Sequence, residues 1–538
     1  MIRARRAPRS LPLLALAALA IVGAAALPLA GRPPAPSAPP APRAAVRPNI
    51  LFILTDDLDL QLRGMDYMPL VRDLLARQGT SFANFFVPIS LCCPSRTSIL
   101  TGVYAHNHRV VTNTPPEGGF ERFQQLGLDR ETIATALHAA GYRTALMGKY
   151  LNGYPDDDHP TYIPPGWDEW EVPADDNAYG GFDYEMNENG KLVKYGHAAG
   201  DYMTDVLSQK AQAFIRHTPQ PYFLYLATYA PHRPATPAPR HRRLFKNYGV
   251  PRTPSWDEAD VSDKPQPFRR LRHLNPDEIL AIDAIYRARL QSLQAVDEMV
   301  EALIDTLRAT GQLAHTYVVF TSDNGFHMGQ HRLRPGKYTA YEEDIHVPFI
   351  LRGPGVPARR VVQALGVSVD LAPTFAELAG ATLPGAPGAP DGRSLVPLWS
   401  SRPPAPGAWR QAVLVEQRPF GAKPAAATPA ADATRGHAGV LEPPDMGDTD
   451  EPGKGIFPPV PYAALRTTTY TYVEYENGER ELYDLIHDPY ELRNLQAKLS
   501  PRFLSQAGAA LSALRTCAGP GCRAADAAPM PALGEAVR

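Results

Sequence analysis

The sequence predicts an α/β protein in which helices sandwich a large, mostly parallel sheet, joined to a smaller C-terminal domain with a short antiparallel sheet. Short, continuous apolar runs recur along the chain and are typical of buried parallel strands. Helical segments lie between these runs, and alternating strands and helices indicate a parallel sheet covered on both faces. The C-terminal part instead alternates polar and apolar residues around a tight-turn dipeptide, which indicates antiparallel strands.

Length and charge limit the classes of function. The 538 residues exceed the size at which one hydrophobic core usually stops growing, so we expect one large domain and a smaller one. The 54 basic and 56 acidic residues are mixed along the chain and form no basic footprint. We therefore expect no nucleic acid partner.

The first 46 residues resemble an export segment and a tether. Residues 1–30 begin with several arginines and continue as an apolar run, which predicts a signal peptide or an N-terminal anchor. Small residues and two prolines in this run favour cleavage. Residues 31–46 are rich in Pro and Ala and predict an extended tether. We expect an exported protein, secreted, periplasmic or on the cell surface, with membrane contact only through a retained N-terminal segment.

Residues 47–400 are predicted to form the catalytic domain. Asn49–Thr55 is the first strand, and a helix is expected at 68–78. Asp129 is expected to cap the next helix, which Gly141 ends. Further strands are expected at 143–147, 222–228, 317–322 and 348–351, with helical stretches such as 279–309 between them.

Residues 401–515 are predicted to form the C-terminal subdomain. Within it, residues 421–459 are rich in Ala, Pro, Gly and acidic residues and have little apolar periodicity, which predicts a mobile insertion. Residues 462–485 alternate around Asn477-Gly478, which favours a hairpin in a small antiparallel sheet. Residues 516–538 form the predicted tail.

The chain contains four cysteines in two pairs. Cys517 and Cys522 close a short loop, which in an exported protein predicts a disulfide. Adjacent Cα atoms lie only about 3.8 Å apart, so a bridge between Cys92 and Cys93 would be strained. No C-x-x-C spacing is present, which disfavours a cysteine zinc site.

The most informative segment is 91–102, LCCPSRTSILTG. Pro94 suits the first position of a helix and Gly102 its end, so a short helix is expected at 94–101 with Cys92 just before it. The free N–H groups and partial positive charge of a helix N-terminus suit a bound sulfate, and Arg96 adds a fixed cation.

Acidic side chains follow two of the predicted strands. Asp56 and Asp57 follow the first, and Asp323 and Asn324 follow the strand at 317–322. Open α/β sheets place their sites where parallel strands end. Three carboxylates and one amide oxygen form a hard ligand set, which favours calcium or magnesium over zinc.

The order Cys92-Cys93-Pro94-Ser95-Arg96, followed by Thr101-Gly102, resembles the C-x-P-x-R signature of the sulfatase family. The resemblance implies an alkaline-phosphatase-like fold and oxidation of Cys92 to formylglycine by a formylglycine-generating enzyme. One hydroxyl of the hydrated aldehyde then attacks sulfur, and the second expels sulfate and restores the aldehyde. The resemblance also implies one calcium ion, rather than magnesium, and the implied ligands are Asp56, Asp57, Asp323, Asn324 and formylglycine 92.

Three further motifs resemble sulfatase motifs in matching order. They are Gly148-Lys149-Tyr150, Ala230-Pro231-His232 and Gly336-Lys337. The implied roles place Lys149 and Lys337 on sulfate oxygens, and His232 on sulfate or as the proton donor to the leaving oxygen.

The sequence also departs from the family pattern. Many sulfatases have Lys-Trp-His where this chain has Lys149-Tyr150-Leu151-Asn152, so Asn152 is expected to replace that histidine at the substrate. His331 lies in a Gly-x-His pattern near Lys337 and is the second candidate for substrate binding. We expect no role for His346, where relatives usually have arginine.

The segments 92–113, 148–154, 162–170 and 230–234 most resemble the N-acetylglucosamine-6-sulfatase and extracellular heparan sulfatase branch. The similarity covers about residues 47–400 and continues more weakly to Leu495. It implies hydrolysis of a sulfate ester on a carbohydrate, such as N-acetylglucosamine 6-sulfate, or of another small sulfate ester. Trp167 and Trp170 are expected to pack in the core.

Several alternatives remain open. One is an arylsulfatase of broad specificity, and another is a formylglycine-dependent hydrolase of phosphonate or phosphate esters. A third is a sugar-binding surface protein in which Cys92 is never converted. A bimetallic phosphatase is disfavoured, because Lys149 and Lys337 stand where a second metal would need anionic or imidazole ligands.

Overall fold

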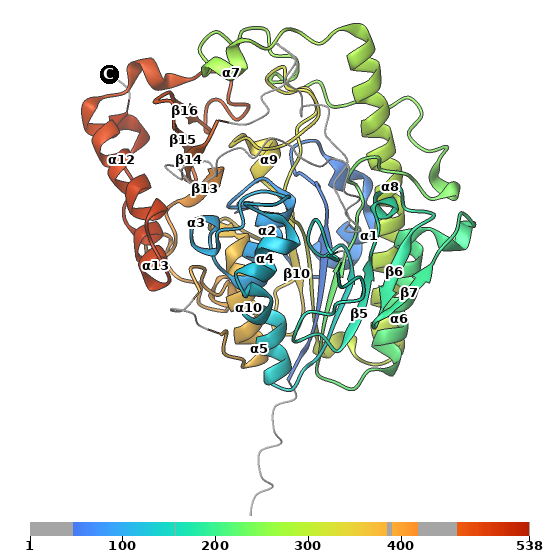
Figure 1. The fold of residues 1–538 in the computed structure, drawn as a ribbon. Coiled ribbons are helices and arrows are strands. Elements are labelled where there is room, and N and C mark those ends of the chain that lie inside the picture. The colour runs from blue at the N-terminus through green and yellow to red at the C-terminus, as the bar shows by residue number, and fades with distance from the viewer. Residues whose placement is uncertain (1–46, 157, 385–389, 418–459, 537–538) are drawn as a thin grey trace, which may run out of the picture. The chain divides into compact units, whose positions relative to one another are not determined.

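The computed structural model describes residues 47–156, 158–384, 390–417 and 460–536 (Figure 1). The predicted export segment and tether at 1–46, and the predicted insertion at 421–459, lie outside the described residues. Among the helices that the structure describes, none has both the length and the apolar character needed to cross a bilayer.

A ten-stranded sheet forms the centre of the fold, with strands in the order β11-β2-β10-β9-β1-β8-β4-β5-β6-β7. Its five central strands are parallel: β9 (Thr316–Ser322), β1 (Asn49–Thr55), β8 (Tyr222–Ala227), β4 (Arg143–Gly148) and β5 (Glu169–Pro173). The outer strands are β11 (Arg360–Val362), β2 (Thr80–Phe82), β10 (Phe349–Arg352), β6 (Glu185–Glu188) and β7 (Lys191–Lys194). They introduce four antiparallel pairings, β2–β10, β10–β9, β5–β6 and β6–β7. The predicted, mostly parallel sheet is therefore confirmed.

Helices cover both faces of this sheet, as predicted (Figure 1). All seven residues of β1 are buried, which requires cover on both sides. Phe52 packs in one apolar cluster with residues of α2 (Cys92–Thr101), α5 (Ile133–Ala139) and α10 (Leu371–Ala379). Ile53 points to the other face and packs with α6 (Met203–His217) and α8 (Pro276–Ala309). Successive side chains of β1 point to opposite faces of the sheet and therefore pack in two different apolar cores.

The remaining helices and the minor strands are short or lie toward the C-terminus. They are α1 (Pro69–Val71), α3 (Ala105–His108), α4 (Gly119–Gln125), α7 (Gln266–Arg269), α9 (Glu342–Ile345), α11 (Val396–Trp399), α12 (Pro501–Arg515), α13 (Pro520–Ala527), β3 (Phe85–Phe86) and β12 (Gly366–Val367). The helix expected at 68–78 is thus a single turn, α1, which continues as a π-helical turn at Arg72–Ala76.

The prediction that Asp129 caps the helix after it is wrong. The cap of α5 is Thr132, whose hydroxyl accepts a hydrogen bond from the Thr135 N–H at 3.4 Å. Asp129 lies in a preceding 3₁₀ turn and accepts a hydrogen bond from the Tyr162 hydroxyl at 2.6 Å. Both residue types favour the cap position, and a tertiary contact engages Asp129 elsewhere.

The C-terminal part contains the predicted antiparallel sheet. Its four strands are β13 (Val413–Gln417), β14 (Tyr462–Arg466), β15 (Tyr470–Tyr475) and β16 (Arg480–Asp484), in that order. The predicted hairpin joins β15 to β16, and Gly478 takes the φ of 86° that its turn requires. Helix α12 packs on this sheet.

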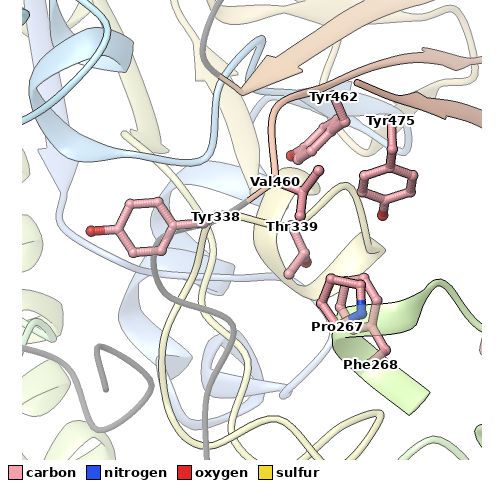
Figure 2. Close-up of a pocket in the computed structure, with 7 residues that line it drawn as sticks. All are labelled: Pro267, Phe268, Tyr338, Thr339, Val460, Tyr462 and Tyr475. Atoms are coloured by element: carbon pink, nitrogen blue, oxygen red, sulfur yellow. The ribbon is translucent and has the colours of Figure 1, made fainter. Parts of the chain in front are cut away.

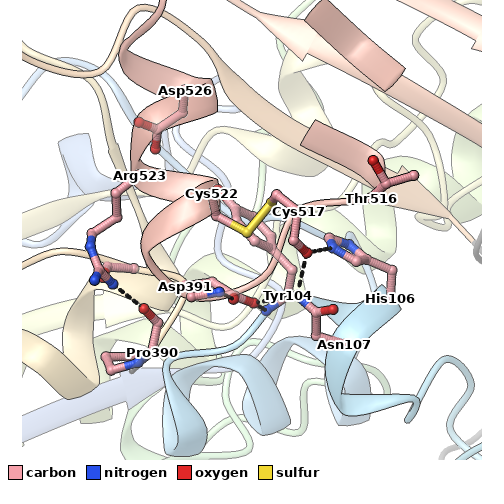
Figure 3. The surroundings of a disulfide bond; sticks show 12 residues. Tyr104, His106, Asn107, Pro390, Asp391, Thr516, Cys517, Cys522, Arg523 and Asp526 are labelled. Carbon is pink, nitrogen blue, oxygen red and sulfur yellow. Dashed lines mark hydrogen bonds between the residues drawn. A yellow bond between two sulfur atoms is a disulfide. The ribbon is translucent and has the colours of Figure 1, made fainter. Parts of the chain in front are cut away.

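Cys517 and Cys522 form a disulfide between α12 and α13 (Figure 3). His106 of α3 lies against it, with Nδ1 3.0 Å from Glu416 and Nε2 3.0 Å from the Cys517 carbonyl oxygen. Both ring nitrogens face acceptors, and both donate only when the imidazole is charged. Burial opposes this charge, but Glu416 outweighs burial and raises the pKa of His106 to about 9.

This pair predicts a pH-dependent component of stability. The folded-state pKa of His106 is about 9, above the ordinary value of 6.5. The contribution of the His106–Glu416 pair to the free energy of unfolding is therefore complete below about pH 6.5, and it is lost as the pH rises through about 9. We expect His106→Gln to remove up to about 3 kcal/mol of unfolding free energy at the acidic side of this window and much less at the alkaline side. Urea unfolding of the wild type and the variant, at the acidic and at the alkaline side of this pH window, measures the two losses of unfolding free energy. Equal losses at both pH values would contradict the prediction.

Candidate active site

The predicted site residues meet at the carboxyl ends of four neighbouring strands, β9, β1, β8 and β4. Asp323 and Asn324 follow β9, Asp56 and Asp57 follow β1, His232 lies in the loop after β8, and Lys149 directly follows β4. One ligand atom each from Asp56, Asp57, Cys92 and His232 lies within 4.8 Å of the others, and all four residues are buried. The parallel strands therefore gather groups that are far apart in the chain.

Cys92 is the first residue of α2, so this helix begins two residues earlier than the predicted start at Pro94. The Cys92 Sγ lies 3.3 Å from Asp56 Oδ1 and 3.1 Å from Lys337 Nζ. Cys93 instead packs in the apolar core, and burial raises its pKa to about 12. The two neighbouring thiols thus occupy opposite environments, and only Cys92 faces the charged groups.

Asp56 and Lys149 form a short buried ion pair, with Lys149 Nζ 2.5 Å from Asp56 Oδ2. Burial alone would raise the pKa of Asp56, but Lys149, with His232, Arg96 and further cations, holds it well below its usual range. Burial likewise opposes the charge of Lys149, but Asp56 raises the pKa of Lys149 well above its usual value. Both groups are therefore ionised.

Asp57 adopts a left-handed backbone conformation, with φ of 64°. Its Oδ1 accepts hydrogen bonds from Lys337 Nζ at 3.0 Å and from Asn324 Nδ2 at 2.6 Å. The Asp57 backbone carbonyl accepts a hydrogen bond from Arg289 Nη2 at 2.5 Å. Arg289, in the middle of α8, was not singled out from the sequence because no motif marks it. It fixes the turn that presents the Asp57 carboxylate.

Arg96 faces the carboxylates rather than an outer pocket. Its Nε donates to Asp323 Oδ2 at 2.7 Å, and its Nη1 donates to the Lys149 backbone carbonyl at 2.8 Å. The second Nη lies 3.8 Å from Asp56 Oδ2. Arg96 is fully buried, so it neutralises two aspartates and fixes the backbone that carries Lys149.

The donor set fits a hard divalent cation. Asp57 Oδ2 and Asn324 Oδ1 are buried, and neither has a hydrogen-bond partner among the described residues. A buried acceptor without a donor is unfavourable, and an oxygen-liganded cation would satisfy both atoms. Asp323 is already engaged, because its Oδ1 accepts the Asp57 N–H at 3.1 Å and its Oδ2 accepts Arg96. His232 also lies beside these carboxylates, with its Nε2 3.5 Å from Asp57 Oδ2.

The two residues predicted to bind the substrate, Asn152 and His331, lie in different surroundings. Asn152 Nδ2 lies 3.3 Å from the Tyr179 hydroxyl, and the Tyr179 ring centroid lies 5.0 Å from Lys149 Nζ and 4.8 Å from the His232 ring. Tyr179 thus links Asn152 to the cluster, and no sequence motif indicated it. His331 makes its contacts elsewhere, with Glu258 and the Tyr341 ring.

A small aromatic pocket lies beside the segment that follows Lys337 (Figure 2). The lining residues are Pro267, Phe268, Tyr338, Thr339, Val460, Tyr462 and Tyr475. None of these seven described lining residues is charged, so their chemistry differs from that of the Cys92 cluster. Figure 2 shows the Tyr338 ring directed away from the other side chains.

Comparison with known proteins identifies relatives of this chain. The model of the Sulfatase family matches residues 48–381. A putative extracellular sulfatase Sulf-1 homolog of Caenorhabditis elegans is 40% identical over 381 residues, covering 69% of this chain and 52% of that protein. The chain therefore spans about half the length of that relative. N-acetylglucosamine-6-sulfatase of Homo sapiens is 34% identical over 496 residues, covering 89% of this chain and 86% of that protein.

A solved structure shares the fold. It is the structure of a protein in complex with its substrate D-glucosamine-2-N,6-O-disulfate, with a TM-score of 0.66 and 24% sequence identity. The match covers 87% of this chain and 97% of that one.

The burial of Arg96 predicts a large effect on stability. Arg96→Ala leaves the buried carboxylate of Asp323 without its cation, so we expect unfolding free energy to fall by about 3–5 kcal/mol. Arg63→Ala serves as the control, because the Arg63–Asp66 pair is exposed and its loss is expected to leave stability unchanged. Chemical denaturation of both variants measures the difference. Similar behaviour of the two variants would contradict the assigned role of Arg96.

Proposed function

The chain belongs to the sulfatase family, and from this premise we propose that it hydrolyses a sulfate ester and releases inorganic sulfate. The observation that carries the proposal is the position of Cys92, at the start of a helix and between Asp56 and the Lys337 ammonium. The tetrahedral sulfate group of an ester bound at this point would meet the helix N-terminus and two buried ammonium groups.

We further propose that Cys92 is converted to formylglycine by a formylglycine-generating enzyme. The hydrated aldehyde would supply one hydroxyl that attacks sulfur, with release of the alcohol, and a second that expels sulfate and restores the aldehyde. The carboxylate of Asp56, 3.3 Å from the Cys92 Sγ, lies where it can accept a hydrogen bond from such a hydroxyl.

A calcium ion would be held by Asp56, Asp57, Asp323 and Asn324 together with formylglycine 92. The ion would supply positive charge to a sulfate oxygen and to the attacking oxygen. The two buried oxygens without a hydrogen-bond partner, Asp57 Oδ2 and Asn324 Oδ1, support this assignment over a site filled only by lysines.

Lys149 and Lys337 are proposed to bind the sulfate oxygens. Each ammonium is held by an aspartate, Lys149 by Asp56 and Lys337 by Asp57, so neither is free to turn away from the site. Charges fixed before the reaction stabilise the charge that develops in the transition state without reorganisation. Arg96 acts through its two aspartates and is a positioning residue.

His232 is proposed as the proton donor to the leaving oxygen. Its Nδ1 donates to the backbone carbonyl of Arg233 at 2.6 Å, which holds the ring and turns Nε2 toward the cluster. A protonated Nε2 beside Asp57 can deliver a proton to the departing alkoxide. Asn152 is proposed to contact the substrate from the side of Tyr179.

The proposed substrate is a sulfated carbohydrate such as N-acetylglucosamine 6-sulfate. The similarity to an N-acetylglucosamine-6-sulfatase over most of both chains supports this choice. An exported location would agree with the extracellular relative and with a sulfated glycan as substrate. An arylsulfatase of broad specificity is the alternative, since arylsulfatases of Volvox carteri and Chlamydomonas reinhardtii are also among the relatives.

Hydrolysis of N-acetylglucosamine 6-sulfate, an aryl sulfate and a matched aryl phosphonate tests the proposal, with protein coexpressed with a formylglycine-generating enzyme. Sulfate release is measured for the two sulfates, and phenol release for the two aryl esters. We expect the sugar sulfate to be hydrolysed, and Cys92→Ala to lower the rate at least on the order of 10³-fold because the nucleophile is lost. Cys93→Ala is the matched control, because Cys93 packs in the core, and it is expected to retain activity.

Two results would contradict the proposed reaction, and a third would contradict only the proposed substrate. Sulfate release by Cys92→Ala at the wild-type rate would exclude Cys92 as the source of the nucleophile. A higher rate on the phosphonate than on either sulfate would indicate a phosphonate ester hydrolase instead. Rapid hydrolysis of the aryl sulfate alone would retain the reaction and reject the sugar substrate.

A further inference from the structure

A second group of buried side chains with metal-ligating atoms lies apart from Cys92. It consists of His331, Glu343 and Glu491, and one ligand atom of each lies within 4.8 Å of those of the other two. At most 5% of any of these residues is exposed to solvent. They come from the loop after β9, from α9 and from the loop after β16, so only the tertiary fold brings them together.

The hydrogen bonds of His331 leave one ring nitrogen available. Nδ1 lies 2.7 Å from Glu258 Oε2, and the ring stacks on Tyr341 with centroids 4.0 Å apart. An ionised Glu258 can only accept a hydrogen bond. In that state Nδ1 carries the proton, and the neutral ring keeps its lone pair on Nε2. Nε2 is buried and has no hydrogen-bond partner among the described residues. A carboxylate behind a histidine is the arrangement that orients metal-binding imidazoles.

Glu491 also has a buried atom without a hydrogen-bond partner, whereas Glu343 has a donor to one of its oxygens. Glu491 Oε2 accepts the Glu342 backbone N–H at 3.0 Å, whereas Oε1 is buried and no described residue donates to it. Glu343 Oε1 accepts a hydrogen bond from the Ser255 hydroxyl at 3.3 Å. Buried acceptors without donors are uncommon and unfavourable in folded proteins, and each one calls for an explanation.

A cation would balance the charges of the cluster in its ionised form. Glu258, Glu343 and Glu491 carry three negative charges when ionised. Lys264 supplies one positive charge, with Nζ 3.4 Å from Glu258 and 2.7 Å from the Glu491 backbone carbonyl. Arg466 is committed to Glu342 at 2.5 Å. With all three carboxyls ionised, two negative charges remain in excess in a buried place, and one divalent ion would neutralise them.

We propose that His331, Glu343 and Glu491 bind a divalent transition-metal ion, of which zinc is the best match. One imidazole nitrogen and two carboxylate oxygens are ligands that zinc accepts, whereas calcium prefers oxygen alone. The site is separate from the cation site at Cys92 and is independent of the proposed sulfatase reaction.

The position of this site indicates what a bound ion does for the protein. His331 and Glu343 lie six residues on either side of Lys337 in the sequence. An ion bound to both would clamp the two ends of the segment that presents Lys337. Glu491 would tie this segment to the loop that follows the C-terminal sheet. The ion is therefore expected to stabilise the fold rather than take part in the reaction.

Zinc binding to the chelator-treated wild-type protein tests the proposal, with calcium present in excess to occupy the oxygen site. We expect one equivalent of zinc by isothermal titration and a rise in melting temperature. Glu491→Gln and Glu343→Gln preserve side-chain shape and are expected to lose this binding. Glu258→Gln is expected to weaken it about 10–100-fold, because it removes the acceptor that orients His331.

Glu481→Gln is the matched control. Glu481 is also a buried glutamate, and it accepts hydrogen bonds from the hydroxyls of Tyr341, Tyr475 and Tyr483 at 2.6 to 2.8 Å. It is not part of the three-residue group, so zinc binding is expected to persist. Unchanged zinc binding in Glu491→Gln and Glu343→Gln would overturn the proposal.

Cobalt in the wild-type protein provides a test that needs no variant. Cobalt bound by one imidazole and two carboxylates gives visible d–d absorption without sulfur-to-metal charge transfer. Cobalt bound at Cys92 adds the charge-transfer band of a thiolate ligand. Wild-type protein that binds no cobalt or zinc, or binds them only with that sulfur band, would contradict the proposal.

Discussion

The fold of this protein depends on the neutralisation of three aspartates, Asp56, Asp57 and Asp323, that are fully buried at the end of its central sheet. Buried carboxylates are tolerated only when cations and hydrogen-bond donors surround them. Arg96, Lys149 and Lys337 meet this requirement, and each contacts at least one of the three. The same requirement places two ammonium groups and a helix N-terminus around Cys92.

The parallel strand order makes this concentration of charge possible. β9, β1, β8 and β4 are parallel neighbours in the sheet, so their carboxyl ends lie at the same edge. The residues that follow these strands in the sequence are therefore close together in space. The backbone of each strand is anchored by its apolar side chains in two separate cores, one on each face. Asp56, Asp57, Lys149, Asp323 and Asn324 therefore directly follow rigid strands, which favours charges that do not reorganise during a reaction.

Much of the fold followed from the sequence because its signals are local. The strand at Asn49–Thr55 is a continuous apolar run, and the hairpin at Asn477-Gly478 is a two-residue turn signal. The failures have tertiary causes. Asp129 and Thr132 are both suitable cap residues. Asp129 instead binds the hydroxyl of Tyr162, 33 residues away in the sequence, and Thr132 caps the helix.

The site shows the same division. Cys92, the aspartates and the lysines lie in recognisable motifs, and the structure brings them together. Tyr179 and Arg289 lie in no motif, although the first contacts Lys149 and His232 and the second fixes the Asp57 backbone. His331 is the opposite case. Its Gly-x-His pattern predicts a residue that binds the substrate, but Glu258 and Tyr341 hold it in a separate buried cluster.

The most direct test of the account is the chemical state of residue 92 in active protein. Peptide mass spectrometry of sulfate-releasing protein distinguishes an aldehyde from a thiol at each of the two adjacent cysteines. The account predicts formylglycine at Cys92, which lies among the charged groups, and an intact thiol at Cys93, which lies in the apolar core. Fully active protein with an unmodified thiol at Cys92 would contradict it.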